Sequence, residues 1–243
     1  YITAEDVGTS VDDMEWIRME TDHVVGVYGG SGDPSPVTAY GVFRGIKASA
    51  MARYGSDSLE GKHVAVQGLG HVGYYLCEDL RAEGARLTVT DIDGEKVARA
   101  VQDFGASAVD TDEIYAVDAD IFAPCALGAV IDDDTLKVMT FDIVAGGANN
   151  QLARSERHGH AIREKGILYA PDYAINAGGL INVYGEIKGW SAERAKRKAG
   201  EIYNTLLRIF ETAEAQQIPT SEAADHVAEE RIRESRHLER SWV

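Results

Sequence analysis

Three glycines in the sequence HVAVQGLGHVG have the spacing of a loop that holds a phosphate group. Residues 63–67 read as a short buried strand, and Gly68, Gly70 and Gly73 follow it directly, before a segment with helical periodicity. In such a unit the first glycine makes the tight turn, the second lets a pyrophosphate approach the backbone, and the third lets helix and strand pack closely. The free N–H groups at the start of the helix favour the anion. The motif therefore predicts a dinucleotide site.

An acidic residue at the end of the next predicted strand indicates which dinucleotide binds. Asp91 follows the segment LTVT and lies 18 positions after Gly73, close to the usual spacing of about 20 residues for the acid that binds the adenosine ribose. A carboxylate there repels a 2′-phosphate, and the first basic residue after it is Lys96. We therefore expect NAD rather than NADP. The alternative is a tight strand–helix turn that binds no nucleotide.

Asparagine residues follow two later strands. Asn149 and Asn150 come after FDIVAGGA, and Asn176 comes before AGG. Ligands of open α/β sheets bind beyond the carboxyl ends of the strands, where amide side chains can meet a carboxamide or a carboxylate. These asparagines are candidate ligand contacts, with ordinary turn residues as the alternative.

Other patterns do not support a separate site. The segment Gly29–Gly32 lacks the GK[ST] ending of a phosphate loop and is interpreted as a flexible connection. His158 and His160 have no further ligands at a suitable spacing, so we expect no metal. Two cysteines are too few for a disulfide framework, and Cys77 and Cys125 are interpreted as small buried side chains.

The order of the predicted elements indicates the fold class. Short β-branched segments alternate with helical ones, which is typical of crossover units in a parallel sheet with helices on both faces. The predicted strands are 63–67, 86–90, 106–109, 120–123, 141–145 and 167–170, and the helices between them are 72–83, 95–104, 133–139 and 155–164. Helices 9–22 and 37–54 precede this pattern, and mostly helical sequence follows from residue 191, with a break at 218–219. The predicted class is α/β, a Rossmann-type doubly wound parallel sheet with a C-terminal helical extension.

The composition narrows the class of protein. The 243 residues are 44% hydrophobic and 26% charged, a balance typical of a globular domain. No apolar run reaches the roughly 18–20 residues that cross a bilayer, and the start YITAEDVGTS is unlike a signal peptide, so we expect a cytoplasmic protein without membrane contact. The net charge of −16 disfavours nucleic acid as a partner. The acid excess, with 16 Arg and 8 Lys, suits either a high-salt source or an ordinary acidic cytoplasmic protein.

Seven segments spread over the chain resemble one known family. They are AEDVGTSVDDMEWI, GDPSPVTAYGVFRGIKA, LEGKHVAVQGLGHVGYYL, TVTDID, DIFAPCALGAVI, VAGGANNQL and APDYAINAGGLINV. Together they are similar to the amino-acid dehydrogenases of the glutamate/leucine/phenylalanine/valine superfamily, over essentially all 243 residues. The resemblance implies NAD-dependent oxidative deamination of an L-amino acid to a 2-oxo acid and ammonia, in a cleft between two domains.

The resemblance also implies roles for residues at matching positions. Asp6 matches the catalytic aspartate, which exchanges a proton with the substrate nitrogen. Thr38 matches the threonine that meets the nicotinamide carboxamide, and Asn149 and Asn176 match positions at the nicotinamide and substrate end. His71 is interpreted as a spacer of the glycine loop rather than an acid. The full set of expected cofactor contacts is Thr38, Gly68, Gly70, His71, Val72, Gly73, Asp91, Cys125, Ala126, Asn149 and Asn176.

Three apolar residues match the family's side-chain pocket, namely Ala4, Leu180 and Val183. An apolar pocket suits Leu, Val or Ile, and it disfavours glutamate because a buried carboxylate without a partner is strongly unfavourable. We therefore expect a branched-chain amino-acid dehydrogenase. The alternatives are a relative that acts on Phe or Glu and a non-catalytic, regulatory NAD-binding module.

The resemblance further implies a division of the chain. We expect residues 1–35 to form a catalytic-Asp segment with a hinge helix and loop, 36–190 an NAD-binding Rossmann domain, and 191–243 C-terminal helices that pack back toward an N-terminal domain. In the family that domain carries a catalytic lysine in a GGxK motif and a second lysine for the substrate carboxylate, and the sequence contains no GGxK motif. We therefore expect part of a longer, homo-oligomeric protein that binds NAD but by itself turns over no amino acid.

Overall fold

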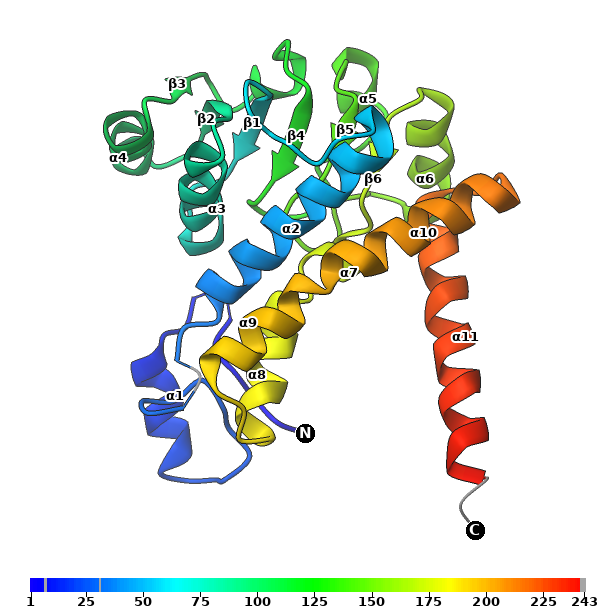
Figure 1. Cartoon of the computed structure of the whole chain (residues 1–243). Helices are drawn as coiled ribbons and strands as arrows, with labels where there is room; N and C mark the ends of the chain where they lie inside the picture. Colours follow the sequence, from blue (N-terminus) through cyan, green and yellow to red (C-terminus); the bar gives the residue numbers. More distant parts are fainter. Residues whose placement is uncertain (7, 31, 241–243) are drawn as a thin grey trace.

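The computed structural model describes residues 1–6, 8–30 and 32–240, with side chains up to residue 235. Within this part, six strands form one parallel sheet (Figure 1). They are β1 (His63–Gln67), β2 (Arg86–Thr90), β3 (Ser107–Ala108), β4 (Ile121–Pro124), β5 (Ile143–Val144) and β6 (Leu168–Tyr169). Their order is β3-β2-β1-β4-β5-β6, and every neighbouring pair is parallel. This is the strand order of doubly wound dinucleotide-binding folds, so the expected Rossmann-type α/β class is confirmed.

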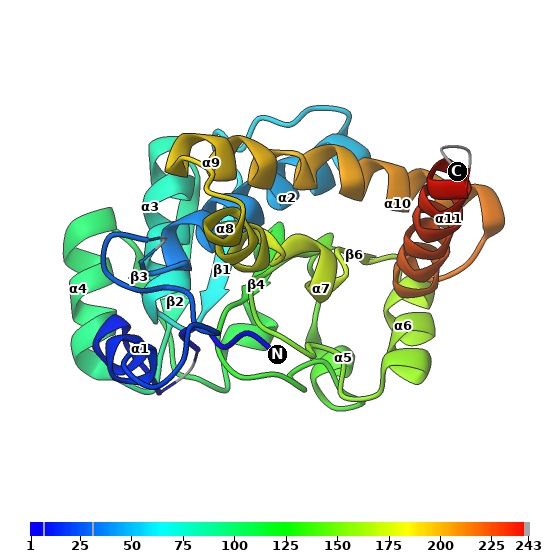
Figure 2. The same ribbon diagram turned by 90° about the horizontal axis from the view of Figure 1, so that it is seen from below.

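Helices precede, connect and follow the strands. Those up to β6 are α1 (Val11–Arg18), α2 (Ser35–Tyr54), α3 (His71–Ala82), α4 (Gly94–Phe104), the 3-10 helix η1 (Ile114–Ala116), α5 (Thr135–Val138) and α6 (Ser155–Glu164). Those after β6 are α7 (Asp172–Ile175), α8 (Gly178–Ile187), α9 (Ala192–Gly200), α10 (Ile202–Gln216) and α11 (Thr220–Arg240). Figure 1 shows α11 extending away from the sheet, and in Figure 2 it is seen nearly end-on.

Alternate residues of the central strands face opposite layers, as expected for a sheet buried on both sides. Val64 and Val66 of β1 pack in a cluster with buried residues of α2, α3, α10 and α11. Ala65, between them, belongs to a second cluster with Phe122 of β4 and with residues of η1, α5 and α6. The sheet is therefore the middle layer of three, and its carboxyl ends point toward the side of the molecule where α1 and α8 lie (Figure 1).

Two glycines let helices from distant parts of the sequence pack against α2. Gly41 and Gly45 are buried and lie about one turn apart. A β-carbon at Gly41 would lie 2.7 Å from Cδ1 of Ile202 in α10, and one at Gly45 would overlap Ile175 of α7. The absence of these side chains allows α2, α7 and α10 to form one layer over the sheet.

The N-terminal segment, residues 1–33, forms a small unit beside the carboxyl edge of the sheet. Ser10 begins α1 with a capping box, in which it and Asp13 bond each other's backbone N–H groups. The backbone of residues 3 and 24 pairs in a parallel bridge. Met14, Val24 and Val27 form a separate apolar cluster. This segment therefore has a small core of its own.

The predicted elements agree with the observed ones to within a few residues at most boundaries. The strands predicted at 63–67 and 86–90 match β1 and β2, and the helix predicted at 155–164 matches α6. The helix predicted at 9–22 is shorter, because α1 ends at Arg18. The sequence pattern does not reveal η1, α7 and α8, which are short or glycine-containing. Among the described residues, no helix combines the length and apolar character needed to cross a membrane.

Candidate functional site at the carboxyl edge of the sheet

The three glycines of the loop after β1 differ in what requires them. Gly68 has φ +94°, and a β-carbon there would lie 2.7 Å from the amide nitrogen of Ala126. A β-carbon at Gly73 would overlap the carbonyl oxygen of Gly68. At Gly70 the backbone has φ −64°, and a β-carbon there would have no described protein atom within 4 Å. Gly68 and Gly73 are therefore needed for the fold, whereas the space at Gly70 is open for a ligand to approach the backbone.

Asp91 connects the glycine loop to the end of β2. Its Oδ2 accepts a hydrogen bond from the backbone N–H of Leu69 (2.6 Å), and its Oδ1 accepts one from the N–H of Asp93 (2.9 Å). The carboxylate is therefore fixed beside the loop, at the position where a ribose-binding acid is needed. Lys96 lies on α4 and is paired with Asp93 at 3.8 Å, not with Asp91.

Cys125 and Ala126 directly follow β4 and lie against the glycine loop. The N–H of Cys125 donates to the carbonyl oxygen of Gln67 (2.7 Å), and its Sγ accepts a hydrogen bond from Gly147 N–H (3.4 Å). Burial raises the pKa of the Cys125 thiol to about 11, although the Gly147 N–H partly opposes this shift. Burial also raises the pKa of Cys77, which is fully buried in α3. Both thiols are therefore protonated and unreactive at neutral pH. Cys77 fits the expectation of full burial, whereas the Cys125 residue is partly exposed although its thiol group is buried.

The two expected asparagines lie together, on loops that follow adjacent strands. Asn176 Nδ2 donates to Asn149 Oδ1 (2.5 Å) and to the carbonyl oxygen of Gly147 (3.3 Å). A β-carbon at Gly147 would lie 3.0 Å from Cγ1 of Val72 in α3, so this loop also reaches the start of that helix. The loops after β1, β4, β5 and β6 therefore border one another, as expected for a site at the carboxyl edge of the sheet.

Thr38 joins this group through the start of α8. Its hydroxyl donates to the carbonyl oxygen of Pro34 (2.9 Å), and a β-carbon at Gly179 would lie 2.8 Å from that hydroxyl oxygen. Leu180 and Val183 follow on α8, where Leu180 is 73% exposed and Val183 is half-buried. An apolar side chain on a surface helix beside Thr38 is available for contact with a ligand or with another part of a larger protein.

The segment that carries Asp6 borders the glycine loop. Asp6 is exposed, its backbone N–H donates to the Thr9 hydroxyl oxygen (2.9 Å), and that hydroxyl donates to the carbonyl oxygen of Asp6 (2.7 Å). Its neighbour Glu5 lies with Asp33 and His71 in a group whose ligand-type atoms are all within 4.8 Å of one another. His71 Nδ1 is 3.5 Å from Asp33 Oδ2. Asp6 therefore follows a residue that reaches the first turn of α3, and Ala4 lies in the same segment.

Glu5 has an unusual environment. Burial raises the pKa of its carboxyl, the charge of Asp33 raises it further, and His71 partly opposes the shift. Its Oε2 is buried with no hydrogen-bond partner among the described residues. The trio of Glu5, Asp33 and His71 could offer three ligands to an ion, but acidic groups commonly gather without one. The expectation that the chain holds no metal stays a prediction.

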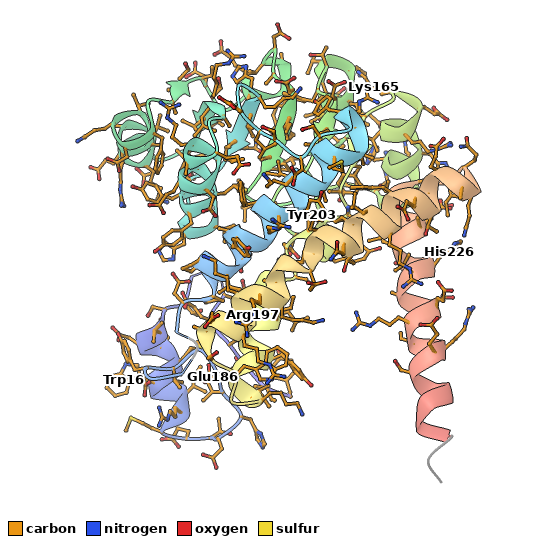
Figure 3. All side chains as sticks on the ribbon, in the orientation of Figure 1. Trp16, Lys165, Glu186, Arg197, Tyr203 and His226 are labelled. Atoms are coloured by element: carbon orange, nitrogen blue, oxygen red, sulfur yellow. The ribbon has the colours of Figure 1, made fainter. Side chains whose placement is uncertain are left out.

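The N-terminal segment is fastened to α8 by Glu186. Its Oε2 accepts a hydrogen bond from Gly26 N–H (2.9 Å), and a β-carbon at Gly30 would lie 2.5 Å from Oε1. Figure 3 shows Glu186 on α8, beside the N-terminal segment that contains Trp16. Sequence reasoning misses Glu5, Asp33 and Glu186, because their partners are distant in the sequence. In the sequence, the glycines at 26–32 are a signal that another group approaches this backbone closely. The interpretation of Gly29–Gly32 as a flexible connection overlooks it.

The comparisons with known proteins agree with this geometry. The family model of the Glutamate/Leucine/Phenylalanine/Valine dehydrogenases matches residues 29–99 and 94–239. A leucine dehydrogenase from Bacillus subtilis (strain 168) is 58% identical over 239 residues, covering 97% of this chain and 65% of the relative. The chain thus spans about two thirds of the length of such relatives.

Solved structures give the same result. The crystal structure of L-tryptophan dehydrogenase from Nostoc punctiforme matches with a TM-score of 0.88 and 46% identity, covering 97% of this chain and 68% of that one. A hetero-hexameric glutamate dehydrogenase from Thermus thermophilus shares the fold, with a TM-score of 0.76 at 23% identity, covering 98% of this chain and 64% of that one. With its parallel sheet, its glycine loop and the match over most of its length, the chain belongs to the glutamate/leucine/phenylalanine/valine dehydrogenase family.

Proposed function

We propose that the chain is the NAD-binding part of an enzyme that oxidatively deaminates branched-chain L-amino acids to 2-oxo acids and ammonia. The observation that carries the proposal is the open space at Gly70. Neither backbone conformation nor packing explains a glycine there, whereas close approach of a pyrophosphate does. The start of α3 offers free N–H groups to that anion. NAD, when bound, would supply the hydride acceptor for the reaction.

The residues around the loop support NAD as the cofactor. Asp91, held by Leu69 N–H, would accept hydrogen bonds from the adenosine ribose and repel a 2′-phosphate. Thr38 and the pair Asn149–Asn176 would bind the carboxamide at the other end, since their amide and hydroxyl groups can donate and accept. His71, Val72, Cys125 and Ala126 would complete the cofactor's surroundings.

The residues outside the sheet support the substrate class. Asp6 is proposed as the group that takes a proton from the substrate nitrogen, because an exposed carboxylate can act as a general base. Ala4, Leu180 and Val183 offer apolar surface and no charge for a substrate side chain. Leucine, valine or isoleucine fits such a pocket better than glutamate does. As part of the same proposal, we expect the whole protein to form a homo-oligomer.

The test is a fluorescence titration of the purified chain with NADH and NADPH. We expect saturable binding of NADH and weaker binding of NADPH. Gly70→Ala should weaken NADH binding at least tenfold without lowering the melting temperature, because its β-carbon meets no protein atom. Gly94→Ala, at the start of α4 and equally open, is the matched control and should leave NADH binding unchanged. NADH binding that is absent, or equal in Gly70→Ala and the unmodified chain, contradicts the proposal.

Turnover gives a second measurement. The family's two lysines have no counterpart among these 243 residues, so we expect leucine-dependent NAD reduction by this chain to stay at background. When one essential member of a group of cooperating catalytic residues is missing, the catalytic rate falls roughly 10⁴- to 10⁶-fold. Robust turnover would show that another residue of this chain performs the lysine's role.

A further inference from the structure

The side chain of Gln151 is fully buried beneath the loop that follows β5. Its Nε2 donates hydrogen bonds to the carbonyl oxygens of Gly146 (2.8 Å) and Ala148 (3.0 Å). Its backbone N–H donates to Asp172 Oδ2 (3.0 Å) at the start of α7. Gln151 therefore closes residues 146–151 into a compact loop and ties that loop to the element that follows β6.

The same loop contains a residue in the left-handed backbone conformation, which needs surrounding contacts to stabilise it. Asn150 has φ +51°, and Ala129, in the facing loop after β4, has φ +61°. The Ala129 N–H donates to the carbonyl oxygen of Asn150 (2.7 Å), so the two left-handed residues are directly bonded. Such conformations are unfavourable for residues with a side chain, and asparagine tolerates them better than alanine does. The surrounding hydrogen bonds, including those of Gln151, hold them in place.

Gln151 also carries an unfavourable feature of its own. Its Oε1 is buried without a hydrogen-bond partner among the described residues. An unpaired buried acceptor lowers stability. A glutamine that contributed only packing would be better replaced by an apolar residue of the same length. The two Nε2 hydrogen bonds, and the loop shape they set, account for its presence.

The loop of residues 146–151 and the expected adenosine position lie at the same edge of the sheet, but on opposite sides of β1 in the strand order. Asp91 directly follows β2, the glycine loop follows β1, and β4 and β5 lie on the other side of β1 in the strand order. A dinucleotide with its pyrophosphate at β1 and its adenosine over β2 extends its other half over β4 and β5. Asn149, two residues before Gln151, is bonded there to Asn176. The nicotinamide half would therefore meet the pair of asparagines whose loop Gln151 supports.

We propose that Gln151 is a positioning residue that sets the place of Asn149 for the nicotinamide half of the cofactor without touching the cofactor. The proposal rests on the NAD binding proposed above. Without the Nε2 donors, the carbonyls of Gly146 and Ala148 lose their partner, Asn150 relaxes toward ordinary backbone angles, and Asn149 moves. The contacts of Asp91 and the glycine loop share no hydrogen bond with Gln151, so the adenosine half of the site stays intact.

Calorimetric titration with NADH and with ADP-ribose separates the two halves, because ADP-ribose contains the adenosine and the pyrophosphate but no nicotinamide. We expect Gln151→Glu and Gln151→Met to bind NADH about five- to tenfold more weakly, the loss expected for one or two misplaced hydrogen bonds, with the Kd for ADP-ribose unchanged. Gln151→Met also removes the unpartnered oxygen. Its melting temperature should therefore fall less than that of Gln151→Glu, whose carboxylate faces two carbonyl oxygens.

Two further variants make the test decisive. Ser49→Ala removes another fully buried side-chain hydrogen bond, from Oγ to the carbonyl oxygen of Gly45 in α2, and should leave both affinities unchanged. Asn149→Ala keeps Gln151 and should reproduce the NADH-selective loss. An equal loss for NADH and ADP-ribose in the Gln151 variants, or no loss for either, overturns the positioning role while NAD binding stands. Failure of the unmodified chain to bind NADH or ADP-ribose overturns the NAD-binding proposal itself.

Discussion

The parallel sheet and the N-terminal segment, residues 1–33, are held together by different forces. The sheet lies between two large clusters of buried side chains. Among its described residues, the N-terminal segment buries a small group around Met14, whereas Trp16 in α1 and Met19 just after it are exposed. Its described links to the rest of the molecule include the Glu186 hydrogen bond and the contact of Asp33 with His71. The candidate cofactor site therefore depends on packing, whereas the position of Asp6 depends on a few polar contacts.

The largest effect is expected from breaking the packed region at Gly68. Gly68→Val introduces a branched side chain at φ +94° and against the backbone of Ala126. We expect the free energy of unfolding to fall by at least about 1–3 kcal/mol, the usual cost of such a backbone conformation, and NADH binding to be lost. Chemical denaturation and NADH titration measure the two effects. A variant with the stability of the unmodified chain would show that the glycine loop adapts and that packing does not fix it.

A smaller and local effect is expected from releasing the N-terminal segment. Glu186→Ala removes the acceptor of the Gly26 N–H, a hydrogen bond to a charged group. Hydrogen exchange should become about tenfold faster in residues 23–30, which corresponds to about 1.4 kcal/mol, and should stay unchanged in β1 and α3. Glu193→Ala, an exposed acid of α9 that pairs with Arg197, serves as the control. Faster exchange in both regions would mean that they unfold together.

The smallest effect concerns pH, at Glu5. Burial and Asp33 raise its pKa in the folded protein, so the folded state binds the proton more tightly than the unfolded state does. The contribution of Glu5 to the free energy of unfolding therefore decreases as the pH rises from the ordinary pKa of 4.5 through the raised pKa of the folded state. Glu5→Gln should melt slightly higher than the unmodified chain at pH 7, and the difference should disappear below about pH 4.5. A variant that melts lower at pH 7 would indicate that the charged carboxylate stabilises the segment.

The sheet can be predicted from the sequence because its signals are local. The strand at 63–67, the glycines after it and the acid at position 91 stand in a fixed order along the chain, and each has its own steric or electrostatic reason. The boundaries of β5 and β6 are predicted less accurately, since these strands are two residues long in the structure. The helix α8 escapes prediction because its first two residues are glycines, which disfavour a helix in isolation.

The rest of the candidate site cannot be derived from local pattern. The bond between Glu186 and Gly26 joins residues 160 positions apart, and neither residue type indicates the other. Gln151 follows two asparagines in a loop, and only the folded chain shows that its side chain turns inward. The roles of Asp6, Ala4, Leu180 and Val183 rest on the resemblance to the family, and they stay predictions, as does the division at residues 35 and 190.

The packing of α2 against α10 affects how this chain folds while the ribosome synthesises it. The surface of α2 around Gly41 and Gly45 is complete once residue 54 has been synthesised, yet its partner Ile202 and the rest of α10 follow about 150 residues later. At about 5–20 residues per second, that surface remains uncovered by α10 for about 7–30 s. During that interval the nascent chain presents an apolar stripe to chaperones and to other nascent chains. A product released before α10 is made would leave the part of α2 that α10 covers exposed.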